Sequence, residues 1–174
     1  MAGVSCVGKS KIGELLAYKI KHIFFDFDKE IEKYFNSTIY FIQKQCFSDR
    51  EYREKTSLIL ENILKNNSNY VVAMCPSGLK DYYYHIIKKY NPTVVCISDT
   101  AENILKRLNF YDEHSRFLNI TLSEREKKLY LREIKKDITY YKKINKKANY
   151  HVNIDGLHIA SSANKIIEIL KSKN

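Results

Sequence analysis

The sequence is short of the residues that interrupt regular structure and of long apolar runs. Its 174 residues include two prolines, five glycines and no tryptophan, and they contain neither an internal repeat nor a linker. No apolar run approaches the roughly 20 residues that a membrane-spanning helix needs. The N-terminus lacks the apolar core of a secretory signal. We therefore expect a soluble cytoplasmic protein of one domain, residues 1–174, acting as a monomer without a membrane partner.

The cysteines and histidines are too scattered to indicate a metal centre. No two cysteines show C-x-x-C spacing, and the histidines have no metal-ligand spacing. We expect reduced thiols in core or loop positions, which argues against disulfides and zinc ligands. The cysteines are Cys6, Cys46, Cys75 and Cys96, and the histidines are His22, His85, His114, His151 and His158.

The net charge is strongly positive, at +10. A basic surface can bind nucleic acid, but these lysines are spread along predicted helices and accompany no nucleic-acid motif. We interpret them as a solvated face that attracts anions such as ATP, and we expect no nucleic-acid partner. The hydrophobic fraction of 44% is typical of a globular chain with a single core.

The most informative motif opens the chain, where Gly3–Ser10 forms a G-x-x-x-x-G-K-S phosphate-binding loop. Its glycines let successive N–H groups face one anion, its lysine reaches the β- and γ-phosphates, and its serine hydroxyl can ligate Mg²⁺. Apolar residues at helical spacing follow, so a helix dipole adds to the site. The residues expected to bind ATP here are Gly3, Val4, Ser5, Cys6, Val7, Gly8, Lys9, Ser10 and Lys11.

The loop has an unusual start. A phosphate loop normally follows a buried β-strand, whereas only Met1 and Ala2 precede Gly3. We expect the first strand to be missing, because the chain is truncated, because its start was assigned too late, or because the fold manages without that strand. The first two explanations are favoured, since losing a central strand would cost stability.

Short apolar strands alternate with helices along the rest of the chain. This pattern predicts an α/β protein, a three-layer P-loop NTPase fold of the nucleoside-monophosphate-kinase-like group with a parallel sheet flanked by helices. Its ligands should lie at the carboxyl ends of the strands. Residues 110–123 are polar and are predicted to be irregular in structure and to form a mobile lid. Strands are expected at 22–28, 70–74, 93–97 and 151–154, and helices at 49–65, 80–90, 100–109, 124–147 and 162–170.

Two carboxylates, Asp26 and Asp28, end the first of these strands. At positions i and i+2 of a regular strand they would point to one face. Beside a phosphate loop, one could hold Mg²⁺ through water while the other accepts the proton of an attacking hydroxyl. The alternative is a pair of solvated turn aspartates.

With these residues in place, the chain resembles the shikimate kinase family over nearly its full length. The family's phosphate loop and first helix match Gly3–Ala17, and its F-x-D-x-D segment and I-E pair match Phe24–Asp28 and Ile31-Glu32. Its S-I pair corresponds to Thr38-Ile39, and its last strand and D-G turn to Val152–Gly156. The phosphate loop alone occurs in many nucleotide-binding enzymes. The resemblance therefore rests on the whole series of motifs, which follow one another in the family's order and spacing.

The resemblance implies roles for three arginines. Arg53 corresponds to the F-R-x-x-E arginine that grips the substrate carboxylate, and Arg107 to the L-x-x-R-L arginine that packs against adenine. Arg116 corresponds to the arginine of the lid R-P-L-L, which contacts phosphates in the closed state. The implied catalytic residues are Lys9, Asp28 and Arg116, and the implied metal ligands are Ser10 and Asp26.

The acceptor side departs from the family pattern. Cys75-Pro76-Ser77, followed by Gly78, replaces a G-G-G turn whose N–H groups bind substrate. Proline has no N–H to donate, and each added Cβ blocks close approach. The second substrate arginine corresponds to Lys136, which cannot make a bidentate grip, and the glutamate of F-R-x-x-E is Thr56. The implied acceptor contacts are Asp28, Arg53, Cys75, Pro76, Ser77, Gly78 and Lys136.

The resemblance therefore implies an ATP- and Mg²⁺-dependent kinase that phosphorylates a hydroxyl of a small carboxylated acceptor. Shikimate is the leading candidate, which would make the reaction a step of aromatic amino acid biosynthesis. The departures leave two alternatives open: a kinase for a different small acceptor, and a degenerate nucleotide-binding protein without kinase activity. A basic nucleic-acid accessory protein is a weaker alternative.

Overall fold

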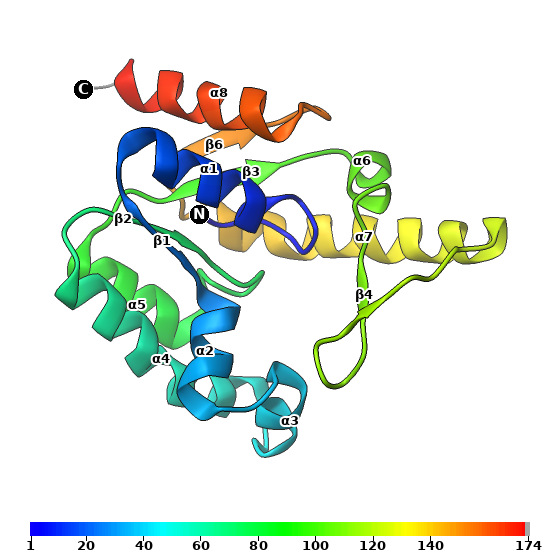
Figure 1. Ribbon diagram of the computed structural model, residues 1–174, viewed down its shortest axis with the longest axis horizontal. Helices are drawn as coiled ribbons and strands as arrows, with labels where there is room; N and C mark the ends of the chain where they lie inside the picture. The colour runs from blue at the N-terminus through cyan, green and yellow to red at the C-terminus, as the bar shows by residue number, and fades with distance from the viewer. Residues whose placement is uncertain (173–174) are drawn as a thin grey trace.

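A computed structural model describes residues 1–172 and shows a parallel sheet made of two strand pairs (Figure 1). β1 (Ile23–Asp26) pairs with β2 (Tyr70–Ala73), and β3 (Val95–Ser98) pairs with β6 (Tyr150–Asn153). The strands are short and rich in valine, isoleucine and aromatic residues, which suit a pleated, buried surface.

Met1 and Ala2 join the two strand pairs. On the β2 side, the amino group of Met1 donates to the Val72 carbonyl, and the Met1 carbonyl accepts from the N–H of Met74 at 2.9 Å. On the other side, Ala2 exchanges backbone hydrogen bonds of 2.8 and 3.0 Å with β3. Two residues thus stand at the position of the strand that we expected to be missing. An apolar cavity of about 290 Å³, lined by residues of β2 and β3 among others, adjoins them.

Helices cover both faces of the sheet (Figure 1). α1 (Lys9–Ile20) and α8 (Ile159–Lys171) pack together, and α4 (Asp49–Asn66) packs with α5 (Asp81–Tyr90). These pairs lie on opposite faces, which confirms the predicted three-layer α/β architecture.

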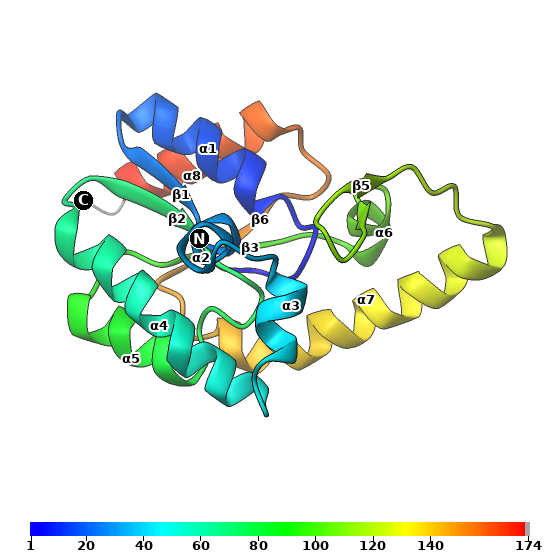
Figure 2. The ribbon, with the colours of Figure 1, turned by 60° about the horizontal axis from the view of Figure 1, so that its bottom comes forward.

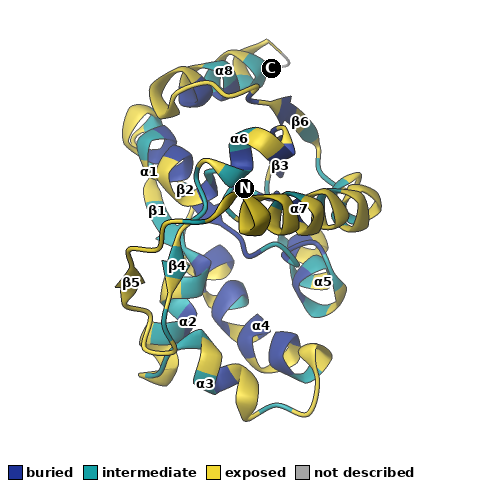
Figure 3. Cartoon of the chain, turned by 90° about the vertical axis from the view of Figure 1, so that its right-hand side faces the viewer, coloured by how far each residue is buried: buried dark blue, intermediate teal, exposed yellow. Residues whose placement is uncertain are grey.

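The alternation of side chains along each strand creates two separate cores. Successive residues of a strand point to opposite faces, so Val71 packs with the α1 and α8 residues while Val72 packs with those of α4 and α5. Figure 3 marks buried and exposed residues by colour, and each of these helices carries both kinds because only one side of it faces the sheet.

The other helices and a small hairpin follow the strands at the carboxyl end of the sheet. The longest helix starts with a capping box between Ser123 and Glu126, and its N-terminal part projects beyond the sheet (Figure 2). Among the described residues, no helix has the length and apolar character needed to cross a bilayer. These elements are α2 (Phe27–Phe35), α3 (Ile39–Lys44), α6 (Ala101–Leu105), α7 (Glu124–Asn145) and the antiparallel hairpin of β4 (Phe110–Tyr111) and β5 (Phe117–Leu118).

Three local predictions were wrong. The first strand ends at Asp26, and Asp28 lies in the first turn of α2, because the buried ring of Phe27 packs edge-on against Tyr83 and starts the helix there. The helix expected over 100–109 ends at Leu105. The polar segment 110–123 contains the β4–β5 hairpin where we expected only irregular structure.

Candidate active site

The loops that follow the strands meet at one edge of the sheet, because parallel strands bring their carboxyl ends together. The phosphate loop follows Ala2, Asp26 ends β1, and the Cys75–Gly78 turn follows β2. These are the segments in which the sequence placed the site. Asp99 and Gly156, which follow β3 and β6, lie at the same edge.

The phosphate loop has a backbone that requires glycine. Gly3 has a φ of 142° and Gly8 a φ of 110°, and a Cβ on Gly3 would lie 2.5 Å from the Ile97 carbonyl oxygen. Gly8 leads directly into α1, whose N-terminal N–H groups and dipole favour an anion. The loop therefore has the geometry of a phosphate cradle.

Lys9 supplies a buried cation inside this cradle. Its side chain is buried, and Nζ donates to the Val4 carbonyl at 2.7 Å. Burial lowers the pKa of Lys9, while the nearby carboxylates of Asp28 and Asp26 oppose the shift. A phosphate oxygen could replace the Val4 carbonyl as the acceptor, since a charged acceptor makes the stronger hydrogen bond.

Asp28 has the electrostatic character of a base. Burial raises its pKa to about 6, and the neighbouring Asp26 adds to the shift while Lys9 opposes it. A carboxyl group with this pKa is mostly ionised at pH 7 and is a better proton acceptor than an ordinary aspartate.

Asp26 and Ser10 offer oxygen ligands of the kind that Mg²⁺ prefers. Asp26 occupies the N-cap position of α2, yet its side chain makes no capping hydrogen bond, so the carboxylate is available to a ligand. Ser10 lies in the first turn of α1 and is exposed. Both residues therefore fit a magnesium ion shared with nucleotide phosphates.

Arg107 links the phosphate loop to the end of β3. Its Nη1 donates to the Val7 carbonyl at 2.9 Å, and its Nη2 pairs with the fully buried carboxylate of Asp99. Asp99 also accepts from Asn103 Nδ2 at 2.9 Å and from the Gly156 N–H at 3.1 Å. Burial on its own would raise the pKa of Asp99, but the hydrogen bonds from Asn103 and Arg107 outweigh it and lower the pKa.

Sequence reasoning missed Asp99. A signal was present, because Asp99 directly follows a buried strand and precedes Thr100, a helix N-cap. That position places a carboxylate at the ligand edge of the sheet. Three of its four hydrogen-bonding partners, Thr100, Asn103 and Arg107, lie within eight residues, but Gly156 lies 57 residues away and no local pattern predicts it.

The predicted lid rests on the α2–α3 connection. Thr38 Oγ1 donates to the Glu113 carbonyl, at 2.7 Å, across the turn between β4 and β5. Arg116 lies in this turn, 73% exposed, and its Nε donates to Asp112 at 2.7 Å. Arg116 therefore lies on an exposed turn and is paired with Asp112.

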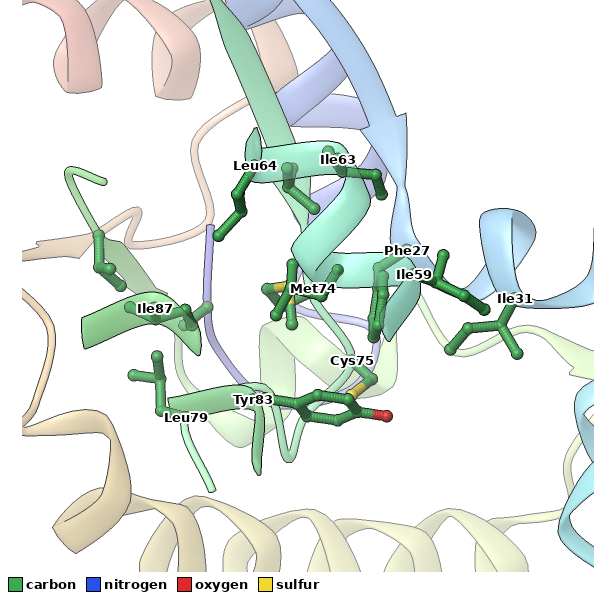
Figure 4. Packing of buried hydrophobic residues seen from close by; sticks show 14 of the residues in the cluster. Phe27, Ile31, Ile59, Ile63, Leu64, Met74, Cys75, Leu79, Tyr83 and Ile87 are labelled. Atoms are coloured by element: carbon green, nitrogen blue, oxygen red, sulfur yellow. The ribbon is translucent and has the colours of Figure 1, made fainter. Parts of the chain in front are cut away.

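The turn that follows β2 carries the side chains of Cys75, Pro76 and Ser77 where the family pattern has three glycines, and Figure 4 shows the first of these, Cys75. Burial raises the pKa of Cys75 to about 11, so its thiol stays neutral, and its sulfur lies 3.4 Å from Ser77 Oγ. Tyr83 packs edge-on against Phe27, and its hydroxyl lies 2.5 Å from Thr56 Oγ1. Figure 4 shows Cys75, Phe27 and Tyr83 gathered in one cluster.

The two cations predicted to grip the acceptor are differently placed. Arg53 is buried on α4, and its Nε donates to Asp81 at 3.0 Å. Lys136 is 63% exposed on α7 and pairs with Glu133 at 2.8 Å. In the described part of the chain, no contact brings Lys136 to Arg53.

These features define a P-loop protein in which the buried Lys9 lies close to Asp28, a carboxylate with a raised pKa, beside a loop shaped to bind phosphate. A family model described as shikimate kinase matches residues 5–171. The chain belongs to the shikimate kinase family, and it is thus an ATP-dependent small-molecule kinase by family and fold.

Solved structures share the fold at low sequence identity. A shikimate kinase from Bacteroides thetaiotaomicron is 19% identical, with a TM-score of 0.80 over 98% of this chain and 96% of that one. A shikimate kinase from Acinetobacter baumannii in complex with shikimate is 20% identical, with a TM-score of 0.77 over 99% and 92%. A gluconokinase from Sinorhizobium meliloti 1021 is 17% identical, with a TM-score of 0.58 over 99% and 94%. No match was found among curated proteins.

Proposed function

We propose that this protein transfers the γ-phosphoryl group of ATP to a hydroxyl of a small acceptor, with shikimate as the leading candidate. The observation that carries the proposal is the proximity of Asp28 to the buried Lys9 of the phosphate loop. Each changes the pKa of the other, so a base and a phosphate-binding cation share one site.

In this reaction the acceptor oxygen bonds to the γ-phosphorus, the bond from phosphorus to the departing ADP oxygen breaks, and the hydroxyl proton passes to Asp28. Lys9 and the N–H groups of the loop stabilise the phosphate charge, since positioning and electrostatics supply most of this catalysis. Arg107 would lie along the adenine. Arg116 would leave Asp112 and close over the transferred group, excluding water.

Ser10 and Asp26 would hold Mg²⁺, with Ser10 binding directly and Asp26 through water. The ion, when bound, neutralises charge on the β- and γ-phosphates. The available N-cap carboxylate of Asp26 supports this assignment.

The acceptor would contact Asp28, Arg53 and the Cys75–Gly78 turn. Lys136 would have to leave Glu133 to take part. We further propose that the protein acts as a monomer in the cytoplasm, with MgATP and the acceptor as its partners.

A kinase for a different acceptor is the second candidate. The glycine turn of the family, expected to contact the acceptor, is replaced here by Cys75, Pro76 and Ser77. In addition, Arg53 is already paired with Asp81. The similarity of fold to a gluconokinase fits this alternative.

The test is ADP formation from MgATP with and without shikimate, in the wild type, in Lys9→Ala and in Lys19→Ala. Lys19 lies exposed at the far end of the same helix and serves as the matched control. We expect shikimate-dependent ADP release that is lost in Lys9→Ala and kept in Lys19→Ala. Absence of stimulation by shikimate would remove that acceptor, and failure of every small polyol or sugar acid tested would favour a nucleotide-binding protein without kinase activity.

A further inference from the structure

Asp99 is a buried carboxylate that the proposed reaction does not use. It directly follows β3, and its side chain is fully buried. Burying a carboxylate is unfavourable unless it is paired and hydrogen-bonded, and here Nη2 of Arg107 donates to Asp99 Oδ2. The partners of Asp99 therefore show what this carboxylate holds in place.

Two of the three guanidinium nitrogens of Arg107 are bonded within the protein. Nη2 is bonded to Asp99, which balances the charge, and Nη1 donates to the Val7 carbonyl at 2.9 Å. A Cβ on Gly8 would lie 3.9 Å from Nη1, so the guanidinium lies against the phosphate loop. The Arg107 side chain is still 31% exposed. It therefore offers a ligand a planar surface whose charge is already paired, which suits an aromatic ring better than a phosphate.

The same carboxylate holds the turn after β6. The Gly156 N–H donates to Asp99, at 3.1 Å from Oδ1 and 3.3 Å from Oδ2. Gly156 has a φ of 71°, and a Cβ there would lie 2.9 Å from Asn103 Nδ2, which itself donates to Asp99 at 2.9 Å. Because one carboxylate bonds to both, Arg107 and the Gly156 turn are fixed as neighbours.

We propose that Asp99 is a positioning residue that holds Arg107 and the Gly156 turn as one surface for the base of the donor nucleotide. The inference rests on the proposed phosphoryl transfer from ATP and deepens it, because it concerns recognition of the base. A nucleotide with its phosphates in the loop carries its base on the adjoining ribose, and Arg107 lies against that loop. The phosphate cradle itself is fixed separately, by its glycines and by the bond from Lys9 to Val4.

The test compares MgADP with magnesium pyrophosphate, which share two linked phosphates and differ by the adenosine. Calorimetry measures the binding of each to the wild type, Asp99→Asn and Glu102→Gln. Asparagine keeps an oxygen for the Gly156 N–H and removes the charge that holds Arg107. Glu102 is the matched control, since its carboxylate lies three residues further along the chain, is 57% exposed and pairs with Lys135 on α7.

We expect Asp99→Asn to bind MgADP about tenfold more weakly than the wild type does, because the guanidinium loses the charged acceptor that fixes its orientation. Pyrophosphate binding should change by less than about threefold. Glu102→Gln should bind both ligands as the wild type does. The direction is diagnostic, since by charge alone the loss of a carboxylate near an anion would tighten the binding of both ligands.

Arg107→Lys keeps the inference testable if Asp99→Asn folds poorly. Lysine retains a positive charge beside Asp99 but has no planar guanidinium. The affinity for MgADP should therefore fall by about tenfold, while the affinity for pyrophosphate should stay within about threefold. Equal affinities of Arg107→Lys and the wild type for MgADP would contradict the proposed surface.

Equal weakening of both ligands in Asp99→Asn would overturn the inference, since Asp99 would then support the phosphate loop. Unchanged or tighter MgADP binding in Asp99→Asn would also overturn it, as would a wild type that gains no affinity from the adenosine.

These binding measurements need no acceptor, so ADP formation tests the proposed function separately. The expected binding pattern in a protein that forms no ADP would support the role of Asp99 and remove the kinase. ADP formation by the wild type, together with unchanged MgADP binding in Asp99→Asn, would keep the kinase and remove the role of Asp99.

Discussion

The nucleotide half and the acceptor half that we propose for this site are built from different parts of the chain. The nucleotide half consists mainly of backbone: two glycines with positive φ, a helix N-terminus and one buried lysine. The proposed acceptor half consists of side chains, among them Cys75, Tyr83 and the Arg53–Asp81 pair. A phosphate needs N–H groups in a fixed arrangement, so its site has little freedom, whereas a side-chain wall can be replaced residue by residue.

The largest expected effect comes from Asp28, which lies between the two halves. Asp28→Asn should lower kcat by about 10²–10⁴-fold, because the proton acceptor is lost. The same change should raise the free energy of unfolding at pH 8 by about 1–3 kcal/mol, because it removes a carboxylate whose pKa is raised by burial. ADP assays and urea denaturation measure the two effects.

Glu30→Gln is the matched control, since Glu30 lies in the same first turn of α2. It should change neither quantity appreciably. Equal losses of activity in both variants, or a less stable Asp28→Asn protein, would contradict the assignment of Asp28 as a base with a raised pKa.

The contrast between backbone and side-chain construction predicts unequal tolerance to substitution. Gly3→Ala should cost about 3 kcal/mol of unfolding free energy or more, because Gly3 has a positive φ and its Cβ would meet a carbonyl oxygen. Pro76→Ala in the acceptor wall should cost less than about 1 kcal/mol. Urea denaturation measures both variants. Similar losses of unfolding free energy at the two positions would show that the backbone-built loop is no less tolerant of substitution than the side-chain wall.

The pH dependence of stability should isolate Asp28. Its pKa is about 6 in the folded protein and 3.8 for the unperturbed group, so the folded state binds more protons between these values. Stability contributed by this group is therefore fully present below about pH 4 and declines as the pH rises to about 6. The difference in unfolding free energy between Asp28→Asn and the wild type should grow across this window and stay constant above it. A difference that does not vary with pH would show that Asp28 has an ordinary pKa.

The smallest expected effect concerns the contact that anchors the acceptor wall. Tyr83→Phe removes the hydroxyl that lies 2.5 Å from Thr56 Oγ1 and should cost about 1 kcal/mol. Tyr82→Phe, at a partly exposed neighbour, should cost less than about 0.5 kcal/mol. Thermal unfolding of both proteins measures the difference, and a larger loss for Tyr82→Phe would show that the wall is anchored elsewhere.

Much of the fold was predictable because its signals are local. The order of strands and helices follows from apolar periodicity, and most predicted elements lie within a few residues of the observed ones. The Asp28 position was mispredicted because the burial of Phe27 under Tyr83, a long-range contact, decided where the helix begins.

Residue types at short, fixed spacing are enough to specify the phosphate loop, the helix after it and the alternation of strands and helices that forms a parallel sheet. Two contacts of the site could be known only from the folded chain: Arg53 meets Asp81, 28 residues away, and Asp99 meets Gly156, 57 residues away. The same holds for the position of Met1 and Ala2 between β2 and β3. Such pairings depend on how whole helices and strands pack, and packing brings together residues whose local sequence gives no sign of a partner.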